Sequence, residues 1–178
     1  MTLPDIDTAF LINFLSDLLN TPSPTGFAEK AIALTEETLS AFPQLKLARN
    51  RKGALLAEWK GEREDAPRAL TAHTDTLGAM VKEIKSNGRL KMTMIGGYAW
   101  NTVEGEGVQV FASRGEPVRG SILLSKSSSH VYGRQVSESK RDEDTMEIRL
   151  DARTTSADET RALGIEVGDF VAFDPRVE

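Results

Sequence analysis

The stretch "RALTAHTDTLGAMV" (68–81) decides how this chain folds. Its first part, 68–72, is a short run of the continuous apolar kind that predicts a strand buried on both faces. His73 and Asp75 follow at the carboxyl end of that strand, and a Leu-Gly pair then opens a second apolar run. Ligands collect beyond the carboxyl ends of strands in open α/β sheets, so the stretch predicts both a sheet and a candidate site.

The spacing of His73 and Asp75 suits metal chemistry. Side chains two residues apart in an extended segment point the same way. A neutral imidazole is a common zinc ligand, and a carboxylate that accepts its second N–H fixes the tautomer. The alternative is a polar pair that arises by chance at the end of a strand. A catalytic zinc needs about three protein ligands, and this stretch offers one.

Other residues make weaker candidates for chemistry. His130, in the polar stretch "SSSHVYG", is expected to be a solvated or hydrogen-bonded loop residue, and 125–129 a mobile loop. The serines beside it lack the G-x-S-x-G pattern of a nucleophile elbow. The acidic run 142–144 lacks the spacing of a calcium loop and is expected at a solvated hairpin end. No facing carboxylate pair is evident, so glycoside hydrolysis is not predicted.

Composition excludes several classes of protein. The chain has 178 residues, 39% of them hydrophobic and 28% charged, which is ordinary for a globular protein. Its net charge of −5 and its scattered basic residues argue against a nucleic-acid partner. The absence of cysteine excludes disulfides, a thiolate zinc site and a cysteine nucleophile. The amino-terminal segment resembles neither a signal peptide nor a membrane span, so we expect a cytoplasmic protein without a membrane partner.

The first third of the chain predicts two helices followed by a strand hairpin. Apolar residues between Asp5 and Leu19 recur every three or four positions, which places them on one helix face that packs against something. Thr25 is expected to cap a second helix that ends near Phe42. Strands are expected at 45–48 and 54–59, joined by a loop containing a glycine.

The rest of the chain predicts a β-rich module. A tight hairpin is expected at 86–88, and the Ser156 and Glu159 spacing is that of a capping box at the start of a short helix. Short alternating runs that predict strands lie at 79–84, 89–95, 107–112, 118–124, 145–151 and 169–174.

Together these elements predict an α/β protein with two modules. Residues 1–78 are expected to form part of an α/β domain. Residues 79–174 are expected to form a β-rich module inserted into that domain, and 175–178 to begin the return to it. The second module is therefore expected to interrupt the first along the sequence.

The resemblance of this chain to a known family rests on four motifs and on their order along the chain. Together they resemble the first half of the tetrahedral glutamyl/leucyl aminopeptidase family, metallopeptidase family forty-two, over nearly the whole chain. The motifs are "PSPTGFAEKA" (22–31), "RNRKGALLAEWKG" (49–61), "ALTAHTDTLGAMVKEIKSNGRLKMTMIGGY" (69–98) and "LGIEVGDFVAFDP" (163–175).

The resemblance implies a fold and an activity. Family members have an α/β-sandwich catalytic domain with two divalent metal ions, usually zinc or cobalt, and an inserted β-barrel used in dimerisation. They remove N-terminal residues from peptides, and several assemble into hollow dodecamers. By this resemblance His73 is a metal ligand and Asp75 the carboxylate that orients it. The family's bridging aspartate, general-base glutamate and remaining ligands follow the barrel in the chain and have no counterpart in these 178 residues.

Two functions are therefore expected. The first is the N-terminal portion of a dinuclear-metal aminopeptidase, a hydrolase that acts on peptides and forms a homo-oligomer, a dimer or a larger assembly. By itself this portion is expected to be inactive and need not hold metal. The alternative is a non-catalytic β-barrel module for oligomerisation or binding, because unpaired strand edges and exposed apolar faces favour association.

Overall fold

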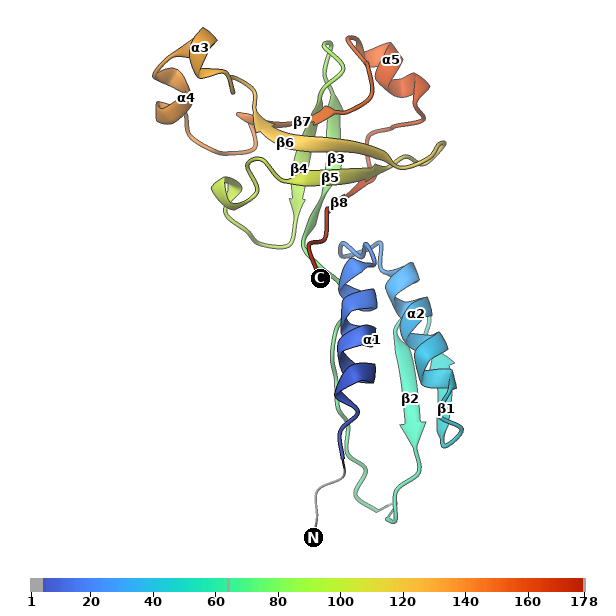
Figure 1. Cartoon of the computed structure of the whole chain (residues 1–178). Coiled ribbons are helices and arrows are strands. Elements are labelled where there is room, and N and C mark those ends of the chain that lie inside the picture. The colour runs from blue at the N-terminus through green and yellow to red at the C-terminus, as the bar shows by residue number, and fades with distance from the viewer. Residues whose placement is uncertain (1–4, 64, 178) are drawn as a thin grey trace. The chain divides into compact units, whose positions relative to one another are not determined.

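The computed structural model describes residues 5–63 and 65–177 (Figure 1). The chain divides into two compact units, one reaching to Asp75 and resuming at Pro175, and the other spanning Thr76–Asp174. Gly78 thus lies inside the second unit. Within the described ranges, no helix is long and apolar enough to cross a membrane.

The first unit contains the two expected helices and the expected hairpin. The helices are α1 (Thr8–Asn20) and α2 (Glu29–Ser40), and the strands are β1 (Leu45–Arg49) and β2 (Leu55–Trp59). The strands pair antiparallel, and the loop between them contains Gly53 at φ 83°, which is the left-handed conformation that glycine adopts without strain. The prediction of two helices followed by a hairpin is confirmed.

Helix α1 is amphipathic, as its sequence predicts, but it is poorly covered. Asp7 caps it by accepting a hydrogen bond from the Phe10 amide at 2.9 Å. The Phe10 ring meets that of Phe42 edge-to-face, with 6.1 Å between centroids. Leu11 and Leu15 nevertheless remain 51% and 47% exposed, and none of the helix residues is buried among the described residues. The apolar face therefore has little to pack against in this unit.

The expected cap of α2 is wrong. The residue before the helix is Ala28, which makes no side-chain capping bond, and Thr25 lies in a turn further upstream. The amide of Phe27 donates to the Pro24 carbonyl at 2.7 Å, and Gly26 has φ 94°. A positive φ at the third of four residues is typical of a type II turn. This turn delays the start of the helix and releases Thr25 for another contact.

The expected buried strand at 68–72 is also wrong. These residues have no strand conformation and are all exposed, and Leu70 is fully exposed. A strand exists only where its backbone groups pair with a neighbour. Among the described residues, β1 and β2 form a two-stranded sheet of their own, and neither pairs with this segment. Residues 68–72 have the apolar pattern of a buried strand, but no described strand pairs with them.

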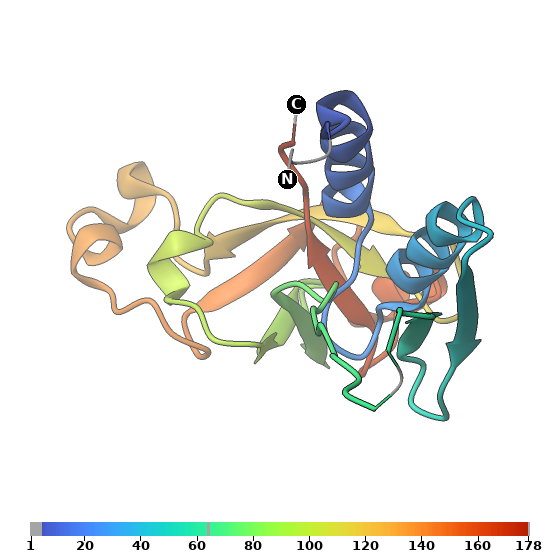
Figure 2. The same cartoon turned by 90° about the horizontal axis from the view of Figure 1, so that it is seen from below.

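The second unit is a closed antiparallel barrel (Figures 1 and 2). Its strands follow one another around the barrel in the order β3-β4-β7-β6-β5-β8, and β8 closes it against β3. All six expected strands are confirmed. They are β3 (Gly78–Ile84), β4 (Leu90–Ile95), β5 (Gly107–Phe111), β6 (Val118–Leu124), β7 (Met146–Leu150) and β8 (Phe170–Phe173).

Alternate residues of these strands fill the barrel. Ile148 on β7 is 0% exposed, and it lies in register with Leu90 on β4 and Ile122 on β6. Period-two alternation is what places one set of side chains inside and the other outside. The interior side chains that are at most 1% exposed include Val81, Leu90, Met92, Val108, Val110, Ile122, Leu124, Met146, Ile148 and Val171.

The short helix α5 (Ala157–Ala162) fixes the β3–β4 hairpin. Ser156 caps it by accepting from the Glu159 amide at 3.3 Å, as the capping pattern predicts. The Glu159 carboxylate accepts from the Thr155 amide at 2.6 Å, one residue before the cap. The buried Thr160 hydroxyl donates to the Gly88 carbonyl at 2.7 Å. The expected hairpin and helix are therefore both present and joined.

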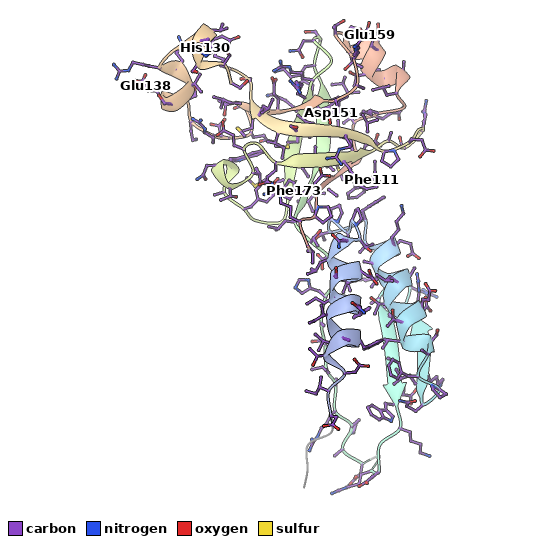
Figure 3. The ribbon with its side chains drawn as sticks, in the orientation of Figure 1. Phe111, His130, Glu138, Asp151, Glu159 and Phe173 are labelled. Carbon is purple, nitrogen blue, oxygen red and sulfur yellow. The ribbon has the colours of Figure 1, made fainter. Side chains whose placement is uncertain are left out.

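The connection between β6 and β7 contains helical turns that the sequence does not predict. Residues 125–128 form a loop, as predicted, and lead into two short helices, α3 (Ser129–Tyr132) and α4 (Gln135–Glu138), which lie away from the barrel strands in Figures 1 and 2. His130 and Glu138 extend from these helices (Figure 3). His130 is exposed, as the polar sequence around it predicts, but it lies on α3 and not in the expected loop. A short 3₁₀ helix, η1 (Trp100–Thr102), lies between β4 and β5.

The charged side chain of Glu147 is buried on the outside of the barrel. Glu147 on β7 lies between the inward-facing Met146 and Ile148, and only 2% of its side chain is exposed. Its carboxylate accepts hydrogen bonds from Lys85 Nζ at 2.6 Å and from the guanidinium of Arg89. These two cations flank the β3–β4 hairpin and cover Glu147. Buried carboxylates require such pairing, because an isolated buried charge is costly.

Candidate functional site

The candidate site lies on an extended segment that is held by a loop about fifty residues earlier. His73, Thr74 and Asp75 have no regular secondary structure. The hydroxyl of Ser23, which is 0% exposed, donates to the Thr74 carbonyl at 2.7 Å. The hydroxyl of Thr25 donates to Oδ2 of Asp75. Two hydroxyls from one loop therefore fix the backbone and the carboxylate of the site.

The His73 ring is oriented by Asp75. Its Nδ1 lies 3.2 Å from Oδ1 of Asp75 and 3.1 Å from the Asp75 carbonyl oxygen. A carbonyl and an ionised carboxylate can only accept hydrogen bonds, so Nδ1 must carry the proton. In the neutral ring, Nε2 then keeps its lone pair. No hydrogen bond joins Nε2 to another described residue, and the side chain is 83% exposed.

The charge state of Asp75 supports this assignment. The hydrogen bond from Thr25 lowers the pKa of the Asp75 carboxyl below its ordinary value, outweighing the partial burial that acts in the opposite direction. The amide of Asp75 itself and the nearby His73 ring lower this pKa further. A carboxyl with a lowered pKa is ionised at neutral pH. Asp75 is then an acceptor for the imidazole N–H.

The donors present fit one ligand of a metal site and not a complete site. Within residues 5–63 and 65–177, no group of three or more histidine, cysteine, aspartate or glutamate side chains could hold a metal ion. Tetrahedral zinc sites use three or four protein ligands. His73 offers one imidazole nitrogen, and Asp75 is engaged with the other nitrogen of that ring. His130 lies in the other unit, on α3, and joins no such group.

The sequence placed His73 and Asp75 together but missed Ser23 and Thr25. The signal was the loop "TPSPTGF" (21–27), in which two hydroxyls lie among two prolines and a glycine. That composition also predicts the end of one helix and the cap of the next, which is how Thr25 is assigned from sequence alone. Prolines and a glycine also build a rigid turn, and a hydroxyl on a rigid turn can reach a distant segment.

Comparison with known sequences points to one family. The profile of the M42 glutamyl aminopeptidase family matches residues 53–178. The chain is 44% identical over 167 residues to the "Putative aminopeptidase YhfE" of Bacillus subtilis (strain 168). That match covers 94% of this chain and 48% of the relative. The chain therefore spans about half the length of the curated relative it matches.

Solved structures share the fold. A TET aminopeptidase from the marine sediment archaeon Thaumarchaeota archaeon SCGC AB-539-E09 matches with a TM-score of 0.81 at 23% identity, covering 96% of this chain and 46% of that one. The TET1 peptidase of Pyrococcus horikoshii matches with a TM-score of 0.69 at 24% identity, covering 92% and 46%. That peptidase can assemble into a tetrahedron or a large octahedral shell. The α/β architecture with an inserted barrel is thus the fold of these structures.

Proposed function

This chain belongs to the M42 glutamyl aminopeptidase family, a family of peptidases, and we propose from this premise that it supplies the N-terminal part of a dinuclear-metal aminopeptidase. In this proposal His73 is a ligand of one divalent metal ion, zinc or cobalt, and Asp75 orients its ring. The substrates are peptides, from which the complete enzyme removes the N-terminal residue. The further metal ligands and the general base belong to additional polypeptide.

The observation that carries the proposal is the arrangement of the His73 ring. Its Nδ1 faces the Asp75 carboxylate while the ring itself is exposed. Histidines that bind metal ions commonly donate their second N–H to a carboxylate, which fixes the ring and raises its basicity. The arrangement therefore favours a ligand role over a polar pair at a strand end.

The apolar surfaces of the first unit support a role as part of a larger domain. The face of α1 is largely exposed, and Leu70 is fully exposed. Contiguous exposed apolar surface in a soluble protein marks a place where another segment packs. We infer that additional polypeptide covers α1 and the exposed residues 68–72. The same polypeptide would supply the ligands that the described residues lack.

We expect no aminopeptidase turnover from residues 1–178 alone. One imidazole cannot hold a metal ion in the geometry that activates water, because catalytic sites use about three protein ligands. The measurement is hydrolysis of an aminoacyl anilide by the purified chain, with zinc or cobalt added. A chimera in which residues 1–178 replace the matching part of the Bacillus subtilis relative is expected to hydrolyse the same anilide in a metal-dependent way.

Two outcomes would overturn the proposed function. One is metal-dependent turnover by the 178-residue chain itself. The other is a folded chimera that has no turnover under conditions in which the intact relative is active. The intact relative is therefore the positive control, and its circular dichroism spectrum and unfolding midpoint are the reference for a folded chimera.

We further propose that the unit Thr76–Asp174 mediates self-association of this chain. Closed barrels have no free strand edges, so association would use its side chains and not β-pairing. The related Pyrococcus horikoshii peptidase assembles into a tetrahedron or an octahedral shell. Sedimentation velocity of the purified chain is expected to show a defined dimer or a larger species. A monodisperse monomer at all concentrations would contradict this.

A further inference from the structure

The loop that carries Thr25 is built to hold its hydroxyl in one place. Pro22 and Pro24 fix two φ angles on either side of Ser23, whose buried hydroxyl bonds the Thr74 carbonyl. Gly26 completes the type II turn, with its positive φ of 94°. Thr25 occupies the second position of that turn. The Thr25 side chain therefore contacts Asp75 from a loop whose backbone has few accessible conformations.

Each oxygen of the Asp75 carboxylate has its own partner. Oδ2 accepts from the Thr25 hydroxyl, and Oδ1 lies 3.2 Å from Nδ1 of His73. A carboxylate held at one oxygen cannot turn freely about its terminal bond, so the second oxygen stays directed at the ring. The contact of Thr25 with Asp75 therefore also fixes the carboxylate relative to the His73 ring. The Asp75 side chain is 36% exposed, so without this contact water would compete for both oxygens.

The geometry points to Thr25 as a positioning residue that holds Asp75 so that His73 keeps its proton on Nδ1 and presents Nε2 to a metal ion. Thr25 itself touches neither the metal nor the substrate. The identity of the Nε2 partner rests on the proposed function. The relation between Thr25 and the tautomer of His73 does not.

A competing explanation makes a different prediction. The Asp75 carbonyl oxygen also lies 3.1 Å from Nδ1, and it could fix the tautomer without the carboxylate. In that case Thr25 would be only a turn residue, and its hydroxyl would have no effect on the ring. Removing the hydroxyl while keeping the shape of the side chain separates the two explanations.

The experiment is a measurement of the histidine tautomers in metal-free protein. The sequence has two histidines, so long-range ¹H–¹⁵N spectra of the histidine-labelled chain contain two imidazoles. The spectra are recorded at a pH about two units above the ordinary pKa of free imidazole, which is about 6.5. We expect His73 in the Nδ1–H form in the wild type and in Thr25→Ser. In Thr25→Val we expect it to change to the Nε2–H form that unconstrained imidazoles favour.

Controls keep the test decisive. His130 lies in the other unit and should be the same in every variant. Asp75→Asn removes the carboxylate charge and should change His73 as Thr25→Val does. Should the valine variant lose the backbone amide pattern of a folded protein, Thr25→Ala removes the hydroxyl with less bulk. Rescue by serine distinguishes a hydroxyl effect from a general loss of structure.

Two results would overturn the inference. One is that His73 keeps the Nδ1–H form in a folded Thr25→Val or Thr25→Ala protein. The other is that Thr25→Ser loses this form as completely as the valine variant does. Failure of the proposed function has a different signature, because a chimera without turnover leaves these spectra unchanged. Conversely, a tautomer that is independent of Thr25 leaves the activity of the chimera unaffected.

Discussion

Replacing Ile148 by alanine is expected to lower the free energy of unfolding of the barrel by about 3–4 kcal/mol. The Ile148 side chain is completely buried and lies between Leu90 and Ile122 on the two neighbouring strands. Truncation loses the transfer free energy of the removed methyl and methylene groups and leaves a cavity. A closed barrel cannot collapse readily around that cavity, because the hydrogen bonds of adjacent strands fix their separation.

The measurement is urea unfolding followed by Trp100 fluorescence. The chain has two tryptophans, and Trp59→Phe leaves only Trp100, which packs against the barrel core. The midpoint should fall while the slope with urea stays the same. The matched control is Ile148→Val, with an expected loss of about 1 kcal/mol. Equal midpoints for the alanine and valine variants would contradict a rigidly packed core at this position.

The strands of the barrel could be predicted because their signal is local. In alternating runs such as 79–84 and 118–124, the sequence itself specifies which side chains face the core and which face solvent. In a closed barrel each such strand has a neighbouring strand on both sides. The capping pattern at Ser156 is likewise decided within four residues. Glu147 is different, because its alternation predicts an exposed side chain. It is buried by Lys85 and Arg89, which lie about sixty residues away.

The first unit shows where sequence reasoning fails. The apolar run at 68–72 predicts a buried strand, but such a strand depends on partners that the pattern does not contain. Among the described residues it has none, and Leu70 is fully exposed. Helix α1 has the same problem, because its periodicity predicts an apolar face without predicting what covers it. Local propensity specifies the element, and tertiary partners specify its burial.

Only the part of the candidate site that is local in sequence could be predicted. The spacing of His73 and Asp75 is local, so their mutual orientation followed from an extended backbone. The Thr25 contact spans fifty residues and depends on a turn that the sequence did not distinguish from a helix cap. The prolines and the glycine were correct signals of a turn. Only the fold shows which segment that turn meets.

The second large effect is expected at His73 in the chimera with the Bacillus subtilis relative. His73→Ala removes an imidazole ligand in this proposal, so turnover of an aminoacyl anilide should fall by more than about 100-fold. Loss of a residue that merely orients a ligand already costs about 10–100-fold in metal affinity or activity. His130→Ala is the matched control, because it removes the other histidine from an exposed position on α3.

Metal content tests the central claim most directly, because it does not depend on substrate or assay. The chimera and its two histidine variants are purified in parallel, dialysed against metal-free buffer, and analysed for zinc and cobalt by mass spectrometry. The account predicts that His73→Ala retains less metal than the parent chimera, while His130→Ala retains the same amount. Equal metal content in all three folded proteins would contradict it.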